Sequence, residues 1–229
     1  MLVETYRTEE EQVEALKNWW QENGRSTVLA IVVALGLGFG WQGWQVSKNE
    51  QIEKSSAVYQ NLIETLDVYE EDGSNDSRTT AIYLANELKE NYSDSTYAYY
   101  AALYLAKFAV EKRDLETAES ELRWVLTRSP GFDIELITQQ RLGRVLAARG
   151  DIKQSLSILS NTNTGKYASG YARAKGDIYL SVNKNAKALE AYQQAKTLDL
   201  DAGGTGQSYL DMKIKHLSPD PASTMSKEE

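Results

Sequence analysis

One long apolar run interrupts an otherwise polar chain of 229 residues. From Thr27 to Val46 about 20 consecutive residues carry no charge, and at about 1.5 Å per helical residue they can cross about 30 Å of hydrocarbon. Trp41 and Trp44 fall near one end of the run, where aromatic rings settle at lipid headgroups. The pattern predicts a single transmembrane helix over residues 26–46, with these tryptophans as part of the membrane anchor.

Two other interpretations of the apolar run are a buried core helix of a soluble protein and a cleaved signal peptide. The rest of the chain is markedly polar, which weighs against a core helix. A signal peptide has a short basic start and a small-residue cleavage site, whereas an acidic segment precedes this run and Gln42, Trp44 and Gln45 follow its centre. We therefore expect a retained anchor.

The segment before the anchor, residues 1–25, is predicted to be a cytoplasmic amphipathic helix. Val13, Leu16 and Trp20 share one helical face, and acidic residues begin the segment. Positive charges flank the anchor almost equally, so the orientation with the N-terminus inside follows chiefly from the short N-terminal segment and the large C-terminal domain. Within the anchor, Gly36 and Gly40 form a G-x-x-x-G pair that permits close helix contact.

Beyond the anchor, three stretches repeat the same arrangement of a small residue, a turn, a second small residue and an apolar position. The small residues of each stretch are 12 positions apart, and the stretches start 37 and 33 positions apart. Two antiparallel helices that pack closely need one small residue each where their backbones approach, as in tetratricopeptide units of about 34 residues. The predicted repeat-packing pairs are Ala106 with Ala118, Gly143 with Ser155, and Gly176 with Ala188.

The flanks of the three stretches complete the predicted repeat domain, residues 47–218. A helix over Ser55–Glu70 and another from about Arg78 to Glu90 read as a degenerate first repeat. Gly203 and Gly204 precede a capping helix, and residues 219–229 are expected to be a disordered tail. The predicted fold class is all-α: an N-terminal single transmembrane helix followed by a tetratricopeptide-like helical-repeat solenoid.

Composition removes most catalytic and cofactor chemistry. The absence of cysteine excludes thiol nucleophiles and sulfur-ligated metals, a single histidine gives no convincing Ser-His-Asp group or metal cluster, and His216 is expected to be a surface residue. The net charge of −8 is spread along the chain, which argues against a nucleic-acid partner. We expect no enzyme activity and no cofactor.

Two further features have both a structural and a functional interpretation. Arg149-Gly150-Asp151 spells an adhesion motif, yet it aligns with Lys112-Arg113-Asp114 and with Asn183-Lys184-Asn185, which favours a turn between paired helices. Tyrosines concentrate over residues 92–104, and Tyr97, Tyr99 and Tyr100 are candidate partner-binding residues, because tyrosine suits adaptable contact with diverse chains. An aromatic core between repeats explains the same tyrosines equally well.

Several segments in a fixed order resemble the ancillary SecYEG translocon subunit family, the YfgM-like periplasmic chaperones of Gram-negative bacteria. The resemblance covers residues 1 to about 218. The segments are Gln12–Lys17, Glu22-Asn23-Gly24 before the anchor, Gly40-Trp41 at its end, Ala57–Asn61, Leu115–Ala118, Arg141–Val145 and Met212–Ser218. The tail of residues 219–229 departs from the family pattern.

The resemblance implies an inner-membrane protein with its N-terminus in the cytoplasm and its C-terminal domain in the periplasm. It implies association with the SecYEG export channel and with a PpiD-like membrane chaperone, and hand-over of exported polypeptides to periplasmic chaperones. The alternative function is a membrane scaffold or stress-response regulator that acts through the cytoplasmic segment of residues 1–25.

Overall fold

The computed structural model describes residues 9–201 and 207–218, and the regular structure in these ranges is entirely helical. Gly203, Gly204 and residues 219–229, for which a chain break and a disordered tail were predicted, lie outside the described residues. In chain order the helices are α1 (Glu9–Asp72), α2 (Asn75–Asn91), α3 (Thr96–Glu111), α4 (Leu115–Leu126), α5 (Phe132–Ala148), α6 (Ile152–Ile158), the 3₁₀ turn η1 (Gly165–Tyr167), α7 (Ala168–Ser181), α8 (Asn185–Asp201) and α9 (Gln207–Leu217). The predicted all-α class is confirmed.

The chain divides into two compact units at the bond between Lys54 and Ser55. This division falls inside α1. The residues around it include no proline or glycine, so α1 continues through them as a helix. The sequence pattern had separated a helix at Ser55–Glu70 from the anchor, and the structure shows instead that both belong to α1.

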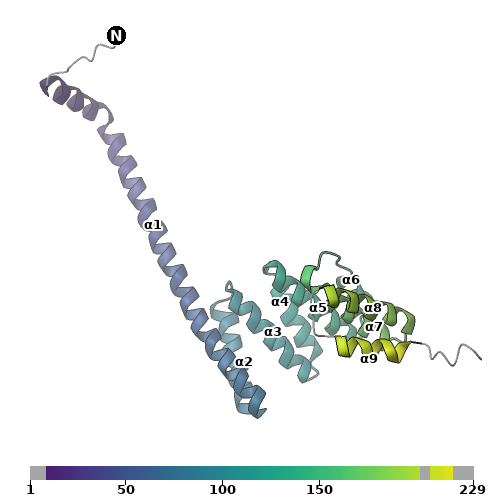
Figure 1. Ribbon diagram of the computed structural model, residues 1–229. Helices are drawn as coiled ribbons and strands as arrows, with labels where there is room; N and C mark the ends of the chain where they lie inside the picture. The colour runs from purple at the N-terminus through teal and green to yellow at the C-terminus, as the bar shows by residue number, and fades with distance from the viewer. Residues whose placement is uncertain (1–8, 202–206, 219–229) are drawn as a thin grey trace, which may run out of the picture. The chain divides into compact units, whose positions relative to one another are not determined.

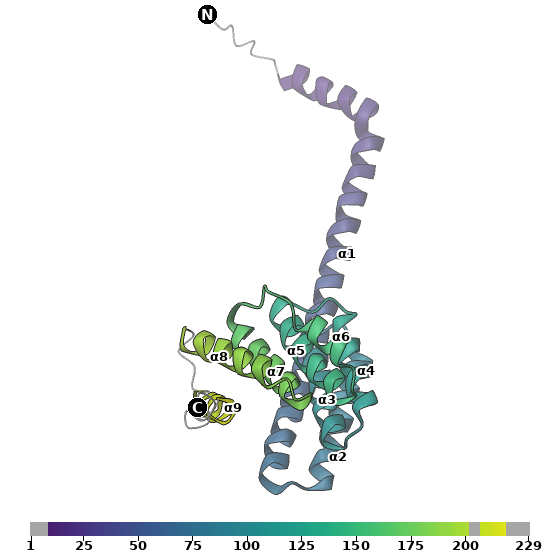
Figure 2. The same cartoon turned by 90° about the vertical axis from the view of Figure 1, so that its right-hand side faces the viewer.

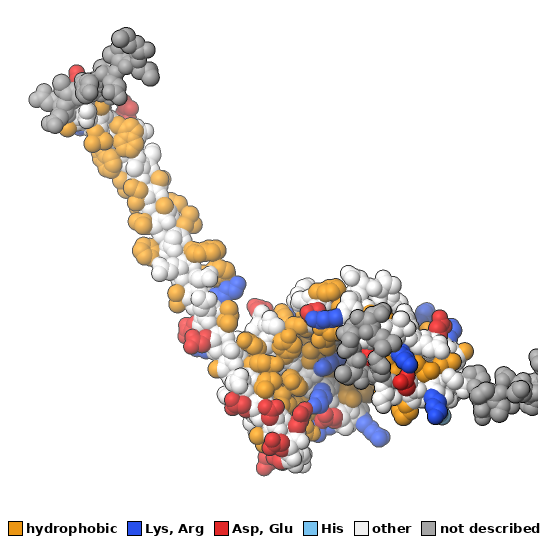
Figure 3. All heavy atoms as spheres, viewed as in Figure 1, with side chains coloured by type: hydrophobic (Ala, Val, Ile, Leu, Met, Phe, Trp, Pro, Cys, Tyr) orange, Lys and Arg blue, Asp and Glu red, His pale blue; other side chains and the backbone are white. Residues whose placement is uncertain are grey.

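In the first unit, apolar side chains of α1 have few neighbours. Leu29 is 65% exposed and Leu37 is 71% exposed. Figure 3 shows hydrophobic side chains along this part of α1. A core helix of a soluble protein would bury such residues, so this interpretation does not fit the described chain. By length and composition, α1 is the one helix among the described residues that could cross a membrane.

The second unit consists of antiparallel helix pairs, with α3 against α4, α5 against α6 and α7 against α8 (Figures 1 and 2). The C-terminal part of α1 and α2 form a further pair, and α9 packs against α8. Side-chain caps start four of these helices: the acceptors are Ser74, Ser95, Asp114 and Asp151. The cap at Ser74, whose Oγ accepts from Ser77 N at 3.1 Å, explains why α2 begins at Asn75, a few residues before the predicted start.

The hydrophobic core is a series of clusters that each join neighbouring pairs. Leu62, Leu88 and Phe108 come together from α1, α2 and α3, and further clusters join α3 to α5, α5 to α7, and α7 to α9. Each pair therefore buries its apolar face only with the help of the next pair, as expected for a repeat domain.

The three repeat turns share one backbone geometry. Arg113, Gly150 and Asn183 each have a positive φ, of 61°, 93° and 57°. The next residue donates its N–H to a carbonyl five positions back, as Asp151 does to Leu146 O at 2.9 Å. By this geometry, Val182-Asn183-Lys184 is the equivalent of Arg149-Gly150-Asp151. The predicted alignment with Asn183-Lys184-Asn185 was therefore wrong by one residue.

Candidate functional site

The two predicted anchor tryptophans lie next to each other on α1. The ring centroids of Trp41 and Trp44 are 5.3 Å apart, and Lys48 Nζ lies 4.9 Å from the Trp44 ring. Trp44 therefore has a cation over its ring, which suits a position at the boundary between hydrocarbon and headgroups. A Cβ added to Gly36 or Gly40 would meet nothing within 4 Å, so no contact within the described chain requires glycine there.

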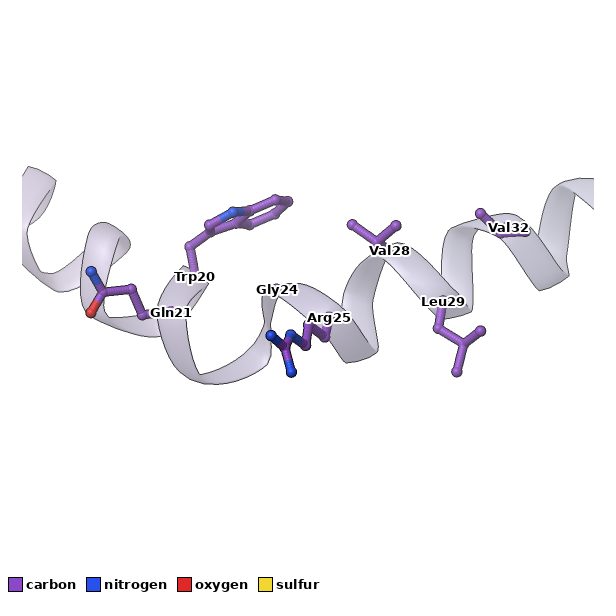
Figure 4. Close-up of a pocket in the computed structure, with 7 residues that line it drawn as sticks. All are labelled: Trp20, Gln21, Gly24, Arg25, Val28, Leu29 and Val32. Carbon is purple, nitrogen blue, oxygen red and sulfur yellow. The ribbon is translucent and has the colours of Figure 1, made fainter.

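At the N-terminal side of the apolar run, Trp20 lies along the helix over Gly24 (Figure 4). A Cβ on Gly24 would lie 3.2 Å from Trp20 Cε2, so glycine lets the indole ring rest against the backbone one turn later. In Figure 4, Trp20 shares its side of the helix with Val28 and Val32, while Arg25 points away from that side. This arrangement keeps a ring and a cation at the same level of the helix.

The predicted repeat-packing residues all lie where the paired helices approach. Ala106, Ala118 and Ala188 are at most 3% exposed. Ser155 is fully buried, and its Oγ donates to Gly143 O at 2.6 Å, so the hydroxyl itself joins α6 to α5. A Cβ on Gly143 would lie 2.8 Å from Leu159 Cγ, and a Cβ on Gly176 would lie 2.7 Å from the Tyr192 ring.

The candidate tyrosines of α3 divide between two surroundings. Tyr97 stacks on Tyr59 of α1 with centroids 4.9 Å apart, and Tyr100, 36% exposed, lies 6.0 Å from the same ring. Tyr99 instead meets the edge of Trp124 at 6.2 Å and packs against a cluster of α3, α4 and α5. The structure thus brings Tyr97 and Tyr100 together with Tyr59, a residue that sequence spacing did not single out as a partner.

Burial raises the pKa of Tyr59 above its ordinary value, with smaller contributions from the neighbouring tyrosines. Tyr59 therefore stays neutral at physiological pH, in a partly buried cluster of rings with Tyr97 and Tyr100. Figure 3 shows hydrophobic side chains gathered over this region of the second unit, beside acidic side chains.

Charged side chains recur at one position in the first helix of each successive helix pair, that is, in α1, α3, α5 and α7. Lys107, Arg144 and Asp177 each follow the small residue of their repeat, and Glu70 precedes Lys107 by the same interval that separates Lys107 from Arg144. We call Glu70, Lys107, Arg144 and Asp177 the charge column. Lys107 Nζ lies 3.5 Å from Glu70 Oε1, and Arg144 Nη2 lies 3.6 Å from Asp177 Oδ2.

Asp177 at the end of the charge column also anchors the C-terminal helices. Tyr192 of α8 and Tyr209 of α9 both donate their hydroxyl to Asp177 Oδ1, at 2.8 and 3.0 Å. Burial and the nearby carboxylate raise the pKa of Tyr209 and, more strongly, that of Tyr192. Both phenols therefore remain donors, and Asp177 joins α5, α7, α8 and α9.

Between Lys107 and Arg144, α3 and α5 enclose an apolar pocket of about 330 Å³ with part of α4. Its apolar lining includes Val110, which is 44% exposed, with Leu115 and Val145. The charged lining residues are Lys107, Glu111, Arg141 and Arg144. We call this the α3–α5 pocket.

The adhesion-like motif and the lone histidine have ordinary surroundings. Arg149 forms an ion pair with Glu119, and a longer one of 3.7 Å with Glu116, so it ties its turn to α4. His216 is exposed on α9. In residues 9–201 and 207–218, no group of three or more His, Cys, Asp or Glu is arranged to hold a metal ion.

The α3–α5 pocket is not apparent from the sequence pattern. The available signal was the charged residue directly after each small residue, which places Lys107 and Arg144 on equivalent faces of neighbouring helices. Val110, by contrast, could not be distinguished from a core residue, because its exposure depends on the width between α3 and α5.

Stacked helix pairs that follow one long exposed apolar helix define a class: helical-repeat binding proteins with a candidate membrane anchor. Residues 17–219 match the family model of the tetratricopeptide repeat-like domain, which confirms the predicted repeat fold. The chain belongs to the ancillary SecYEG translocon subunit family, and the resemblance drawn from the sequence is confirmed.

Relatives in three bacteria show how much of the chain this family covers. Each is described as an ancillary SecYEG translocon subunit. The protein of Haemophilus influenzae is 31% identical over 91% of this chain and 97% of its own length. That of Escherichia coli is 27% identical over 94% of this chain and its full length, and that of Neisseria gonorrhoeae is 26% identical over 91% and 97%. No solved structure matches the chain significantly.

Proposed function

We propose that this protein is a membrane-anchored, non-catalytic ancillary subunit of the SecYEG translocon. The observation that carries the proposal is the match to relatives of this description over nearly the whole chain, including the apolar part of α1. A repeat domain supplies a binding surface without reaction chemistry, which suits a subunit that holds other chains.

The finer proposal concerns topology and hand-over. Residues 1–25 remain in the cytoplasm, residues 26–46 span the inner membrane, and residues 47–218 face the periplasm. There the repeat domain receives polypeptides that leave the channel and passes them to periplasmic chaperones, with a PpiD-like membrane chaperone as a neighbour. Tyr97 and Tyr100 support this proposal, because they present a partly exposed aromatic surface beside Tyr59.

Site-specific photocrosslinking in intact cells tests the proposal. A probe at Gly36 of α1 is expected to attach to a channel subunit, and one at Tyr100 to attach to exported chains or a periplasmic chaperone. A probe at Lys153, which is exposed on α6, is the matched control for the outer domain. Attachment of a cytoplasmic regulator alone, lost when residues 1–20 are deleted, would favour the scaffold alternative instead.

The tyrosine surface has a separate test. Replacing Tyr97 and Tyr100 by Ala removes the rings that stack on Tyr59, whereas replacing Tyr83, 67% exposed on α2, removes a ring with no such neighbours. Crosslinking of exported chains is expected to fall only in the first variant, with helicity retained by circular dichroism. Equal crosslinking in both variants would leave the tyrosines as core residues between repeats.

A further inference from the structure

The charge column is paired at both ends but not in the middle. Glu70 faces Lys107, and Arg144 faces Asp177, so each pair combines opposite charges. Between the pairs, Lys107 and Arg144 come from equivalent positions of neighbouring repeats, and both line the α3–α5 pocket. Two cations beside one pocket repel each other and favour an anion between them.

Other charges in the pocket lining add to this excess of positive charge. Arg141 also lines it, and the one hydrogen bond described for its guanidinium is a long contact to Leu103 O at 3.4 Å. A guanidinium has five N–H donors, so most of its capacity remains available. The only acid in the lining, Glu111, is within 3.7 Å of Arg78 and accepts from Tyr69 OH at 3.4 Å. Its charge is therefore shared with Arg78.

The remainder of the pocket is apolar and open to a ligand. Val110 exposes 44% of its surface, and Leu115 and Val145 line the same space. Pockets for small ligands range from about 300 to 1,000 Å³, so about 330 Å³ is enough for one or two apolar side chains. The Lys107 and Arg144 side chains are each 42% exposed, and ion pairs of this kind contribute little, so both can turn toward a ligand at small cost.

We propose that the α3–α5 pocket binds an extended segment of an exported polypeptide in which an apolar residue stands beside an Asp or Glu side chain. The carboxylate lies between Lys107 and Arg144 and extends the alternation of charges through the middle of the charge column. The apolar residue covers Val110 and Leu115. This proposal rests on the proposed function and adds the class of substrate.

Binding of short labelled peptides to the full chain in detergent micelles tests the proposal by fluorescence anisotropy. Gly-Ser peptides carry one central pair: Phe-Glu, Phe-Ser, Phe-Lys or Ser-Glu. We expect the Phe-Glu peptide to bind about tenfold more tightly than Phe-Lys, and the difference to shrink in high salt. Equal affinity for Phe-Glu, Phe-Ser and Phe-Lys would overturn the proposal.

Variants separate the charged from the apolar contribution. The double change Lys107→Gln with Arg144→Gln is expected to make Phe-Glu bind no better than Phe-Ser, and Lys107→Glu to raise the affinity for Phe-Lys. Arg128→Gln with Lys153→Gln is the matched control, since both residues are exposed outside the pocket. If this control lowers Phe-Glu binding as much, the effect comes from net charge and the proposal fails.

Val110→Ser is expected to weaken all three Phe peptides about threefold or more while Ser-Glu changes little. Its control, Val68→Ser, removes a side chain that is also half exposed but lies outside the pocket. If Val110→Ser instead dissociates an oligomer and leaves peptide binding unchanged, a second copy of the chain occupies the pocket and the proposal is overturned. Crosslinking from Gly36 reports the proposed function independently, so its loss and loss of peptide binding are distinguishable.

Discussion

Glycines occupy both units of the chain, and their surroundings differ. In the repeat domain, a Cβ on Gly143 or Gly176 would come within 2.8 Å of a buried side chain, Leu159 directly after α6 or Tyr192 of α8. In the apolar part of α1, a Cβ on Gly36 or Gly40 would meet nothing within 4 Å. The repeat glycines are explained by contacts inside the domain, whereas the anchor glycines would have to be explained by a bilayer or a partner helix.

The largest effect is expected from Gly176→Ala. The new Cβ would lie 2.7 Å from two atoms of the Tyr192 ring, which is fully buried and held by its hydroxyl on Asp177. Overpacking typically costs about 1–3 kcal/mol, occasionally more, and the helical preference of alanine returns about 1 kcal/mol. We expect a net loss of about 2 kcal/mol, visible as a midpoint lowered by about 4–8 °C in thermal melts followed by circular dichroism.

A double variant checks the cause of that loss. Tyr192→Leu removes the ring atoms that the new Cβ would meet, so Gly176→Ala should cost much less in its presence. Strictly additive losses in the two single variants and the double variant would show that the ring and the glycine are not coupled.

A smaller loss is expected from Gly143→Ala. Here the Cβ would lie 2.8 Å from Leu159 Cγ, and the leucine side chain can shift more readily than a tethered ring. After the gain in helical preference, we expect a net loss of about 1 kcal/mol, or about 2–4 °C in the same melts. A loss as large as that of Gly176→Ala would mean that the hydrogen bond from Ser155 to Gly143 O fixes this interface as firmly as the tyrosine does.

Gly143 and Gly176 also show which parts of the fold can be predicted from the sequence. All six small residues predicted from the interval of 12 positions are buried, as expected if one pair of helices fixes the separation between their points of closest approach. The residues that contact the glycines also share one offset, since Leu159, directly after α6, and Tyr192 of α8 each follow their glycine by the same number of positions. Local spacing therefore predicted the interior of each pair.

Features that join different repeats were not predictable in the same way. The α3–α5 pocket depends on the distance between α3 and α5, the first helices of two neighbouring pairs. Spacing along the sequence does not give this distance. Likewise, Tyr97 and Tyr99 are two residues apart on α3, yet one meets Tyr59 of α1 and the other meets Trp124 of α4. The turn alignment failed because a positive φ, rather than residue type, marks the equivalent positions, and Arg113 carries one without being glycine.

Gly170→Ala should bring little or no loss of stability, although its added Cβ would make the shortest contact of the three. Its Cβ would lie 2.6 Å from Gln140 Nε2, which is the far end of a flexible side chain. The amide can move away, so the helical preference of alanine, up to about 1 kcal/mol, is expected to leave stability unchanged or slightly higher. A melting midpoint lowered as far as that of Gly143→Ala would show that the Gln140 side chain is held in place. The distance to the added Cβ, rather than the flexibility of the contacted side chain, would then predict the loss of stability.

The smallest effect on folding is expected in the anchor. Gly36→Leu with Gly40→Leu adds bulk where no atom lies within 4 Å, so the melting midpoint of the full chain in detergent should not change. If this face contacts another helix in the membrane, photocrosslinking from Leu37 to that helix should fall, because the leucines hold the backbones apart. Gly38→Leu adds the same bulk about 200° around the helix from Gly36 and is the matched control. An equal reduction of crosslinking by all three leucines would mean that a thicker helix weakens the contact at any position. A reduction confined to Gly36 and Gly40 would show that these glycines contact a partner helix in the membrane, as the repeat glycines contact side chains within their own domain.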